Sequence, residues 1–228
     1  MVNLIIIGTS HIAKESVAQV RKVIEDVKPA VVALELDSGR AHALLSKKEG
    51  KLRWCDIKKI GFKGFLFSII GGYVERKLGE RVGTVPGSEM KAAIFAARKI
   101  GAQVALVDQD ISVTLKRFSQ VLSWREKLRL VGELFYGVLG FGQKITFDLA
   151  KVPEKETIKK LTKEVKKKYP NVYRVLVAER NLFMAKKLIQ ICRQMPEATI
   201  VAVVGAGHEG DIKQLVERSV PIPALRGN

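Results

Sequence analysis

Short, almost continuously apolar runs alternate with longer segments of mixed polarity along this chain. Four of the runs have the length of buried strands: residues 4–7, 31–36, 103–107 and 198–204. Runs without polar alternation are typical of strands that are covered on both faces, as in parallel sheets. The pattern therefore predicts an α/β fold with a largely parallel sheet and flanking helices.

Helical periodicity fills much of the chain between these runs. Apolar residues recur every three or four positions from Lys14 to Val27, which predicts a helix. A second helix is expected to begin at Pro86-Gly-Ser88 and to end at Gly101, because proline and glycine favour these positions. A third helix is expected over about 172–195, where Pro196 stops it.

Two longer stretches, at about 52–82 and 112–168, do not follow this alternation. Both look helical and contain several glycines, which permit close approach of neighbouring helices. We expect them to be helical insertions within a single domain that spans residues 1–228.

Two of the three histidines stand three residues after a glycine that ends an apolar run. His11 follows Gly8, and His208 follows Gly205. Glycine lets the chain turn sharply at the end of a strand and delivers the histidine to the carboxyl edge of the sheet, where open α/β sheets bind ligands. If the two strands are neighbours, the two imidazoles meet.

Carboxylates are expected at the same edge, because Glu35 and Asp37 end the second strand. Two imidazoles and one carboxylate, from His11, His208 and Glu35, suit a divalent ion such as manganese, cobalt, zinc or iron. A water bound to that ion has a lowered pKa and can act as the nucleophile. Glu35 can instead be a general base, with the ion held by the histidines and water. A capping or packing role for both histidines is the alternative.

Two arginine-bearing motifs add candidates. Arg40 lies just beyond the second strand, where it can hold a carboxylate, stabilise an oxyanion or form a surface ion pair. In Glu179-Arg180-Asn181, the glutamate has apolar neighbours one helical turn away on both sides, so its charge requires a partner. Structural pairing and a role in the site both fit this position.

Glu89 and Asp108 complete the candidates. Glu89 falls in the first turn of its expected helix, where the helix dipole favours an anion, so it either caps the helix or serves the site. Asp108 ends the third strand and therefore reaches the same edge. His42 lies among alanines and leucines on an apparent helix and is expected only to pack.

Together these segments resemble the TraB/PrgY family, part of the Tiki and erythromycin esterase/ChaN-like superfamily. The matching motifs follow the family's order: Gly8-Thr-Ser-His11, Val32 to Arg40, Pro86 to Met90, Glu179-Arg-Asn181 and Gly205-Ala-Gly-His208. The resemblance implies the α/β core of that superfamily. It also implies a hydrolase-like site, in relatives that look like metal-dependent proteases or are tied to shutdown of peptide pheromone signals.

The resemblance makes His11, His208, Glu35 and Arg40 the matching functional positions. Our first hypothesis is a metal-dependent hydrolase that attacks a peptide or other acyl bond. We assign metal binding to His11, His208 and Glu35, catalysis to Glu35, Arg40, Glu179 and Arg180, and substrate contacts to Asn181, Glu89 and Asp108. The second hypothesis is a non-catalytic protein that sequesters a peptide, as in pheromone shutdown. The sequence departs from the family at Gln109, where an arginine is usual.

The net charge of +17 would attract anionic lipid, nucleic acid or an acidic substrate. The lysines of 151–168 alternate with glutamates, as on solvated helix faces, and aromatic stacking motifs are absent, so nucleic acid is the least favoured partner. A membrane surface, touched by 64–74 and 130–143, and a homo-oligomer are both compatible with the sequence.

Cys55 and Cys192 make no paired spacing, which fits a reducing compartment. We expect a cytoplasmic protein able to associate with a membrane, although the C-terminal membrane helices of prokaryotic relatives are absent from this chain.

Overall fold

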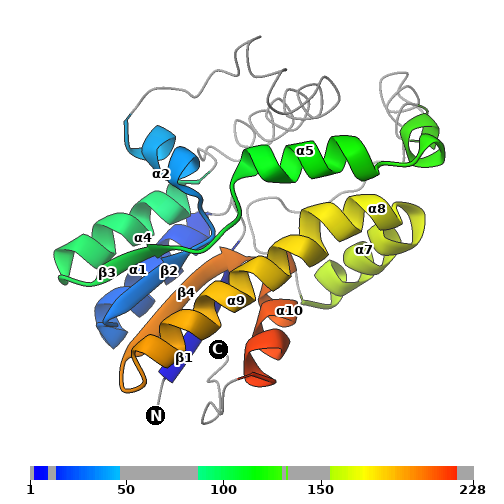
Figure 1. Cartoon of the computed structure of the whole chain (residues 1–228). Coiled ribbons are helices and arrows are strands. Elements are labelled where there is room, and N and C mark those ends of the chain that lie inside the picture. Colours follow the sequence, from blue (N-terminus) through cyan, green and yellow to red (C-terminus); the bar gives the residue numbers. More distant parts are fainter. Residues whose placement is uncertain (1–2, 10–13, 47–86, 130–131, 133–154, 220–228) are drawn as a thin grey trace.

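The computed structural model describes residues 3–9, 14–46, 87–129, 132 and 155–219 (Figure 1). Within these residues the centre is a four-stranded parallel sheet with the order β1-β4-β2-β3. The predicted α/β fold with a largely parallel sheet is confirmed. The strands run over Asn3–Thr9 (β1), Val31–Leu34 (β2), Gln103–Leu106 (β3) and Thr199–Gly205 (β4).

The first and last strands of the chain are neighbours in the sheet. Asn3 lies opposite Thr199, and the register continues to the pair Thr9 and Gly205. Strand β4 also pairs with β2, with Leu34 opposite Val203. The two strands that lead into the Gly-x-x-His motifs therefore lie side by side, as the sequence hypothesis requires, and their carboxyl ends are level.

Helices cover both faces of the sheet. Helices α1 and α4 pack on one face, and α9 and α10 on the other (Figure 1). Alternate residues of β4 belong to opposite cores, because side chains of a strand point to alternate faces. The helices run over Lys14–Val27 (α1), Ser38–Leu45 (α2), Ser88–Lys99 (α4), Ile111–Val121 (α5), Lys155–Lys168 (α7), Pro170–Tyr173 (α8), Glu179–Gln194 (α9) and Ala206–Glu217 (α10).

Gly87, directly before α4, has a backbone conformation that favours glycine. Gly87 precedes the helix with φ of 81°, in the left-handed region that side chains with a Cβ rarely adopt. Gly101, just beyond the other end, has φ of 74°. The predicted helix between these two glycines is therefore confirmed, including the reason for both.

The expected helix at 172–195 is correct in position but wrong in one detail. A π-helical turn, Arg174–Ala178, separates α8 from α9. A π-turn holds one extra residue, which rotates the following side chains by about 100° relative to an uninterrupted α-helix. The turn ends directly before Glu179-Arg180-Asn181 and so changes the direction in which that motif points.

The two helical insertions and the single domain stay predictions. The stretch 52–82 lies outside the described residues, and so does most of 130–154. The described parts of 112–168 are largely helical. Among the described residues, no helix is both long and apolar enough to span a bilayer.

Candidate functional site

Polar side chains gather where the parallel strands end. Glu35 follows β2 directly, Asp108 comes two residues after β3, and His208 lies in the first turn of α10, which begins where β4 ends. Because all these strands are parallel, their carboxyl ends share one edge of the sheet. Glu35 and Asp108 are buried there.

Arg180, from the start of α9, is the centre of the cluster. Its Nε donates to Asp108 Oδ1 at 3.1 Å and its Nη2 donates to Asp108 Oδ2 at 2.6 Å, a two-point contact. The same Nη2 donates to Glu35 Oε1. Burial lowers the pKa of Arg180, but its bonds to Asp108 and Glu35 outweigh this effect and raise the pKa above its ordinary value. The guanidinium is therefore a fixed positive charge.

Glu35 connects two strands through its carboxylate. Its Oε2 accepts a hydrogen bond of 2.6 Å from the backbone N–H of Gly205, at the end of β4. Its Oε1, which takes the hydrogen bond from Arg180, lies 3.4 Å from His208 Nε2. The second strand thus places its terminal acid directly against the histidine of the second Gly-x-x-His motif.

His208 is held through its other ring nitrogen. Nδ1 lies 2.5 Å from Asn181 Oδ1, on α9. Nε2 points into the charged cluster, where it is also 3.4 Å from Arg180 Nη1. The imidazole is 12% exposed, so it retains a path to solvent.

Arg40 forms the more exposed side of the cluster. Its backbone N–H donates to Asp37 Oδ1 at 2.9 Å, so Asp37 caps α2, and its Nε donates to Asp37 Oδ2 at 2.6 Å. Its Nη2 donates to Asp108 Oδ2, which Arg180 also contacts. The three carboxylates and two guanidiniums leave one net negative charge when His208 is neutral.

The structure brings together six of the predicted site residues and places others elsewhere. Glu179 is turned toward Arg117 of α5, whose Nη2 donates to it at 2.7 Å, and toward Arg174. The hydrogen bond from Arg117 is the main cause that lowers the pKa of Glu179. This geometry matches the structural pairing that the sequence left open. The six residues in the cluster are Glu35, Arg40, Asp108, Arg180, Asn181 and His208.

Glu89 and His11 are not among the six residues of the cluster. Glu89 is 1% exposed in the first turn of α4, on the face of the sheet that α1 and α4 cover. His11 lies outside the described residues, so its meeting with His208 stays a prediction. The described strand before it ends at Thr9, whose hydroxyl donates to the carbonyl of Val204 at 3.2 Å.

The glycine of the first Gly-x-x-His motif leaves room for an acidic side chain. A Cβ on Gly8 would lie 2.2 Å from Oε2 and 3.1 Å from Cδ of Glu209. The carboxylate of Glu209, in the first turn of α10, therefore lies directly over the end of β1. Sequence reasoning assigned this glycine to a turn and missed the acid that covers it.

Asp211 and Tyr173 are further residues that sequence reasoning missed. Asp211 accepts a hydrogen bond of 2.9 Å from Asn181 Nδ2 and one of 3.4 Å from the hydroxyl of Tyr173. Asp211 comes three residues after His208, and on a helix such residues share a face. The three-residue spacing between His208 and Asp211 is the feature of the sequence that could have identified Asp211.

The described part of the site fits two of the predicted metal ligands. Ligands of a tetrahedral ion with bonds of about 2.1 Å are about 3.4 Å apart. His208 Nε2 and Glu35 Oε1 are 3.4 Å apart. Within the described residues no group of three or more His, Cys, Asp or Glu side chains is arranged to hold an ion, and the predicted third ligand, His11, lies outside them.

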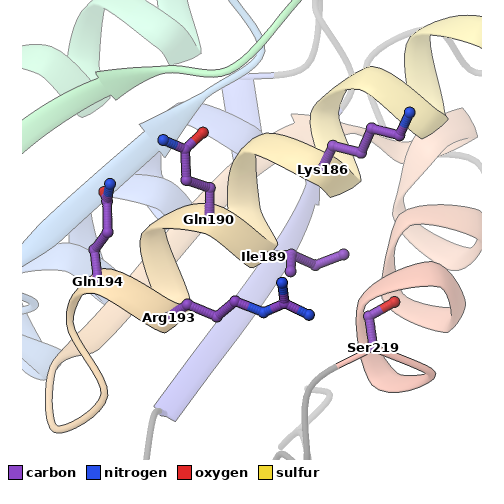
Figure 2. A pocket seen from close by; sticks show the side chains of 6 residues that line it. All are labelled: Lys186, Ile189, Gln190, Arg193, Gln194 and Ser219. Carbon is purple, nitrogen blue, oxygen red and sulfur yellow. The ribbon is translucent and has the colours of Figure 1, made fainter.

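A cavity of about 430 Å³ lies along the second half of α9, near the end of α10 (Figure 2). Its nearest residue in sequence to the cluster is Lys186, which is about 9 Å further along the helix axis than Arg180 at a rise of 1.5 Å per residue. The cavity is therefore a feature separate from the cluster. It is lined by Lys186, Ile189, Gln190, Arg193, Gln194 and Ser219.

The fold and the cluster define an α/β protein with a polar site at the carboxyl edge of an open parallel sheet. The chain belongs to the TraB/PrgY/gumN family, whose model matches residues 2–218, so the predicted family is confirmed. An uncharacterized protein of Methanocaldococcus jannaschii is 38% identical over 221 residues, which cover 93% of this chain and 53% of that protein.

More distant relatives carry the family's name. The TraB domain-containing proteins of Homo sapiens and Mus musculus are each 26% identical over 234 residues, covering 92% of this chain and 61% of theirs. The chain thus spans between half and two thirds of the length of these curated relatives.

Proposed function

We propose that this chain is a metal-dependent hydrolase that cleaves a peptide or another acyl bond. One observation carries the proposal: His208 Nε2 lies 3.4 Å from Glu35 Oε1 at the edge of the sheet where β1 also ends. Residue 11 follows two positions after β1, which supports its assignment as a further ligand. His208, Glu35 and His11 would hold manganese, cobalt or zinc.

A bound divalent ion supplies a water of lowered pKa and polarises an acyl oxygen. The chain's own residues supply charge and orientation. Arg180 is fixed by Glu35 and Asp108, with Nη1 turned toward His208, and it would stabilise negative charge that develops on an acyl oxygen there. Arg40, on the more exposed side, would orient the substrate. If Glu35 is not a ligand of the ion, its Oε1 would instead accept a proton as a general base.

The test is hydrolysis of peptide and ester libraries by purified protein with manganese, cobalt or zinc added in turn. We expect turnover that chelation abolishes and that His208→Ala reduces by at least about 100-fold. His42→Ala is the matched control, because His42 lies exposed on α2 and should leave the rate unchanged. Absence of turnover with every ion, or equal rates for both variants, would rule the proposal out.

A non-catalytic peptide-binding role is the second candidate. It is favoured by the engagement of Glu35, both of whose oxygens already accept a hydrogen bond, one from the N–H of Gly205 and one from Arg180. A carboxylate so engaged orients neighbouring groups more readily than it exchanges protons. Peptide binding that persists in His208→Ala, together with absent hydrolysis, would support this role.

For partners, we propose contact with an anionic lipid surface. Trp124 and Leu128, one helical turn apart, are 73% and 69% exposed, and the Lys127 ammonium lies 4.8 Å from the Trp124 ring centre. Exposed apolar side chains beside basic ones match the acyl boundary and the headgroups of such a surface. Binding to vesicles with anionic lipid, weakened by Trp124→Ser and by salt, is the expected result; binding to neutral vesicles alone would contradict the charge argument.

A further inference from the structure

A chain of hydrogen bonds leads away from the proposed metal ligand to an acid outside the cluster. His208 Nδ1 lies 2.5 Å from Asn181 Oδ1, and Asn181 Nδ2 donates to Asp211 Oδ2 at 2.9 Å. Asn181 is 2% exposed and belongs to α9, whereas His208 and Asp211 lie three residues apart on α10. The amide is therefore a buried bridge between two residues of the neighbouring helix.

The chemistry of the end group fixes every proton in this chain. An ionised carboxylate only accepts hydrogen bonds, so the NH₂ of Asn181 must face Asp211. The amide oxygen then faces His208, and because a carbonyl oxygen also only accepts, Nδ1 of the imidazole must carry the proton. When the imidazole is neutral, Nε2 therefore carries the lone pair, 3.4 Å from Glu35 Oε1 and 3.4 Å from Arg180 Nη1.

We propose that Asp211 is a positioning residue that acts through Asn181 to hold His208 in the tautomer with the proton on Nδ1. In this tautomer the lone pair that a metal ion requires is on Nε2. The naming of Nε2 as a metal donor rests on the proposed function. The tautomer itself is a property of the protein alone.

Tyr173 holds the acid at the far end of the chain. Its hydroxyl lies 3.4 Å from Asp211 Oδ2, and burial, followed by the charge of Asp211, raises the pKa of the phenol. Tyr173 therefore keeps its proton and donates it to Asp211. The residue directly precedes the π-helical turn that sets the direction of Asn181, so one short segment positions both partners of Asp211.

An amide in the middle of the chain has a physical advantage over a carboxylate there. A carboxylate in contact with Nδ1 would favour the charged imidazolium, whose Nε2 has no lone pair for a metal. The cluster on the Nε2 side already has one net negative charge, which acts in the same direction. Asn181 transmits the orienting effect of Asp211 without placing a second negative charge against the ring.

The experiment reads the tautomer directly from the ¹⁵N chemical shifts of the imidazole in the protein, followed from about pH 6 to pH 9 so that the neutral ring is observed. In the parent protein Nδ1 should give the shift of a protonated nitrogen and Nε2 that of an unprotonated one. In Asp211→Asn the second amide can donate as well as accept, so Asn181 can reverse, and the two shifts should move toward each other.

A double variant separates the tautomer effect from a general structural effect. Asn181→Asp combined with Asp211→Asn exchanges the amide and the acid, and the new acid at 181 again accepts from Nδ1. Nδ1 should therefore again give the shift of a protonated nitrogen, which distinguishes this variant from Asp211→Asn. Glu217→Gln, which removes a charge from the other end of α10, is the matched control and should change neither shift.

Zinc or manganese titration of the same proteins provides the second measurement. Asp211→Asn should weaken binding by about 10- to 100-fold, whereas Glu217→Gln should leave it unchanged. A proton on Nε2 in the parent protein, or unchanged shifts in Asp211→Asn, would overturn the inference. If the shifts behave as expected but no ion binds, the tautomer device stands and the proposed hydrolase fails.

Discussion

Replacing Arg180 by methionine tests the charge balance of the cluster. The change removes the guanidinium that donates to both Asp108 oxygens and to Glu35, while it keeps most of the side-chain volume. Glu35 and Asp108 are 3% and 6% exposed, so neither carboxylate gains compensating water. Two buried negative charges would then lie close together without the cation between them.

Removal of one partner from a buried ion pair costs about 3–5 kcal/mol. The lower end applies here, because Asp108 keeps Arg40 and Glu35 keeps the N–H of Gly205. For a chain of 228 residues, each kcal/mol lowers the melting temperature by about 2–4 °C, so about 3 kcal/mol corresponds to roughly 6–12 °C.

Thermal unfolding followed by circular dichroism measures this difference, and urea unfolding gives the free energy independently. Arg117→Met is the control, because it removes an arginine from the more exposed pair with Glu179 and should cause a much smaller shift. Arg180→Lys should fall between the two variants, since it keeps the charge but loses the two-point contact. If Arg180→Met melts within about 2 °C of the parent protein, the cluster does not depend on this guanidinium, and the reasoning fails.

The remaining predictions concern other parts of the fold. Burial raises the pKa of Glu126, but hydrogen bonds from Asn171 and Ser123 together hold that pKa below its usual range. The stabilisation by the charge is therefore present above the unfolded pKa and is lost as the pH falls through the lowered folded pKa. Urea unfolding should show Glu126→Gln less stable than the parent protein at neutral pH, with a difference that disappears in acid. Gly8→Ala should cost about 1 kcal/mol, the lower end of the range for overpacking, because the carboxylate of Glu209 can move whereas Cα of Ala206, 3.3 Å from the new Cβ, moves less easily; calorimetry should find that loss reduced by a second change, Glu209→Ala. Gly87→Ala should lower the free energy of unfolding by about 1 kcal/mol, because residues with a Cβ rarely adopt its φ of 81°.

Much of the fold follows from local pattern. The strands were predictable because their apolar runs are short and uninterrupted, and α1 because its stripe has a clear helical period. The hypothesis of a shared histidine site required β1 and β4 to be neighbours, but the sequence did not predict this. Strand order depends on how the connections cross the sheet. The π-helical turn at Arg174–Ala178 was not predicted, because one extra residue shifts the apolar stripe by a single position, which is hard to distinguish from the mixture of three- and four-residue spacings in an ordinary helix.

The site was predictable where residues end strands and less so where they lie on helices. Glu35 and Asp108 follow buried strands, and parallel strands deliver such residues to one edge. The central place of Arg180 was not predictable, because its contact with Glu35 joins positions 145 residues apart. For Glu179, the apolar surroundings correctly indicated a need for a charged partner, but only the structure identifies Arg117 as that partner.

Charge balance connects these observations to the chemistry. Two arginines neutralise all but one of the three carboxylates at the edge, so a divalent ion would give the site a net positive charge of one. Such a site attracts the negative charge that develops on an acyl oxygen during hydrolysis, provided that His208 binds the ion as a neutral imidazole. A protonated His208 would instead add its own charge and repel the ion. The Asn181 bridge and the Arg180 cluster therefore act on two different properties of the proposed site: the first sets which ring nitrogen of His208 carries the proton, and the second balances the charge of the acids around it.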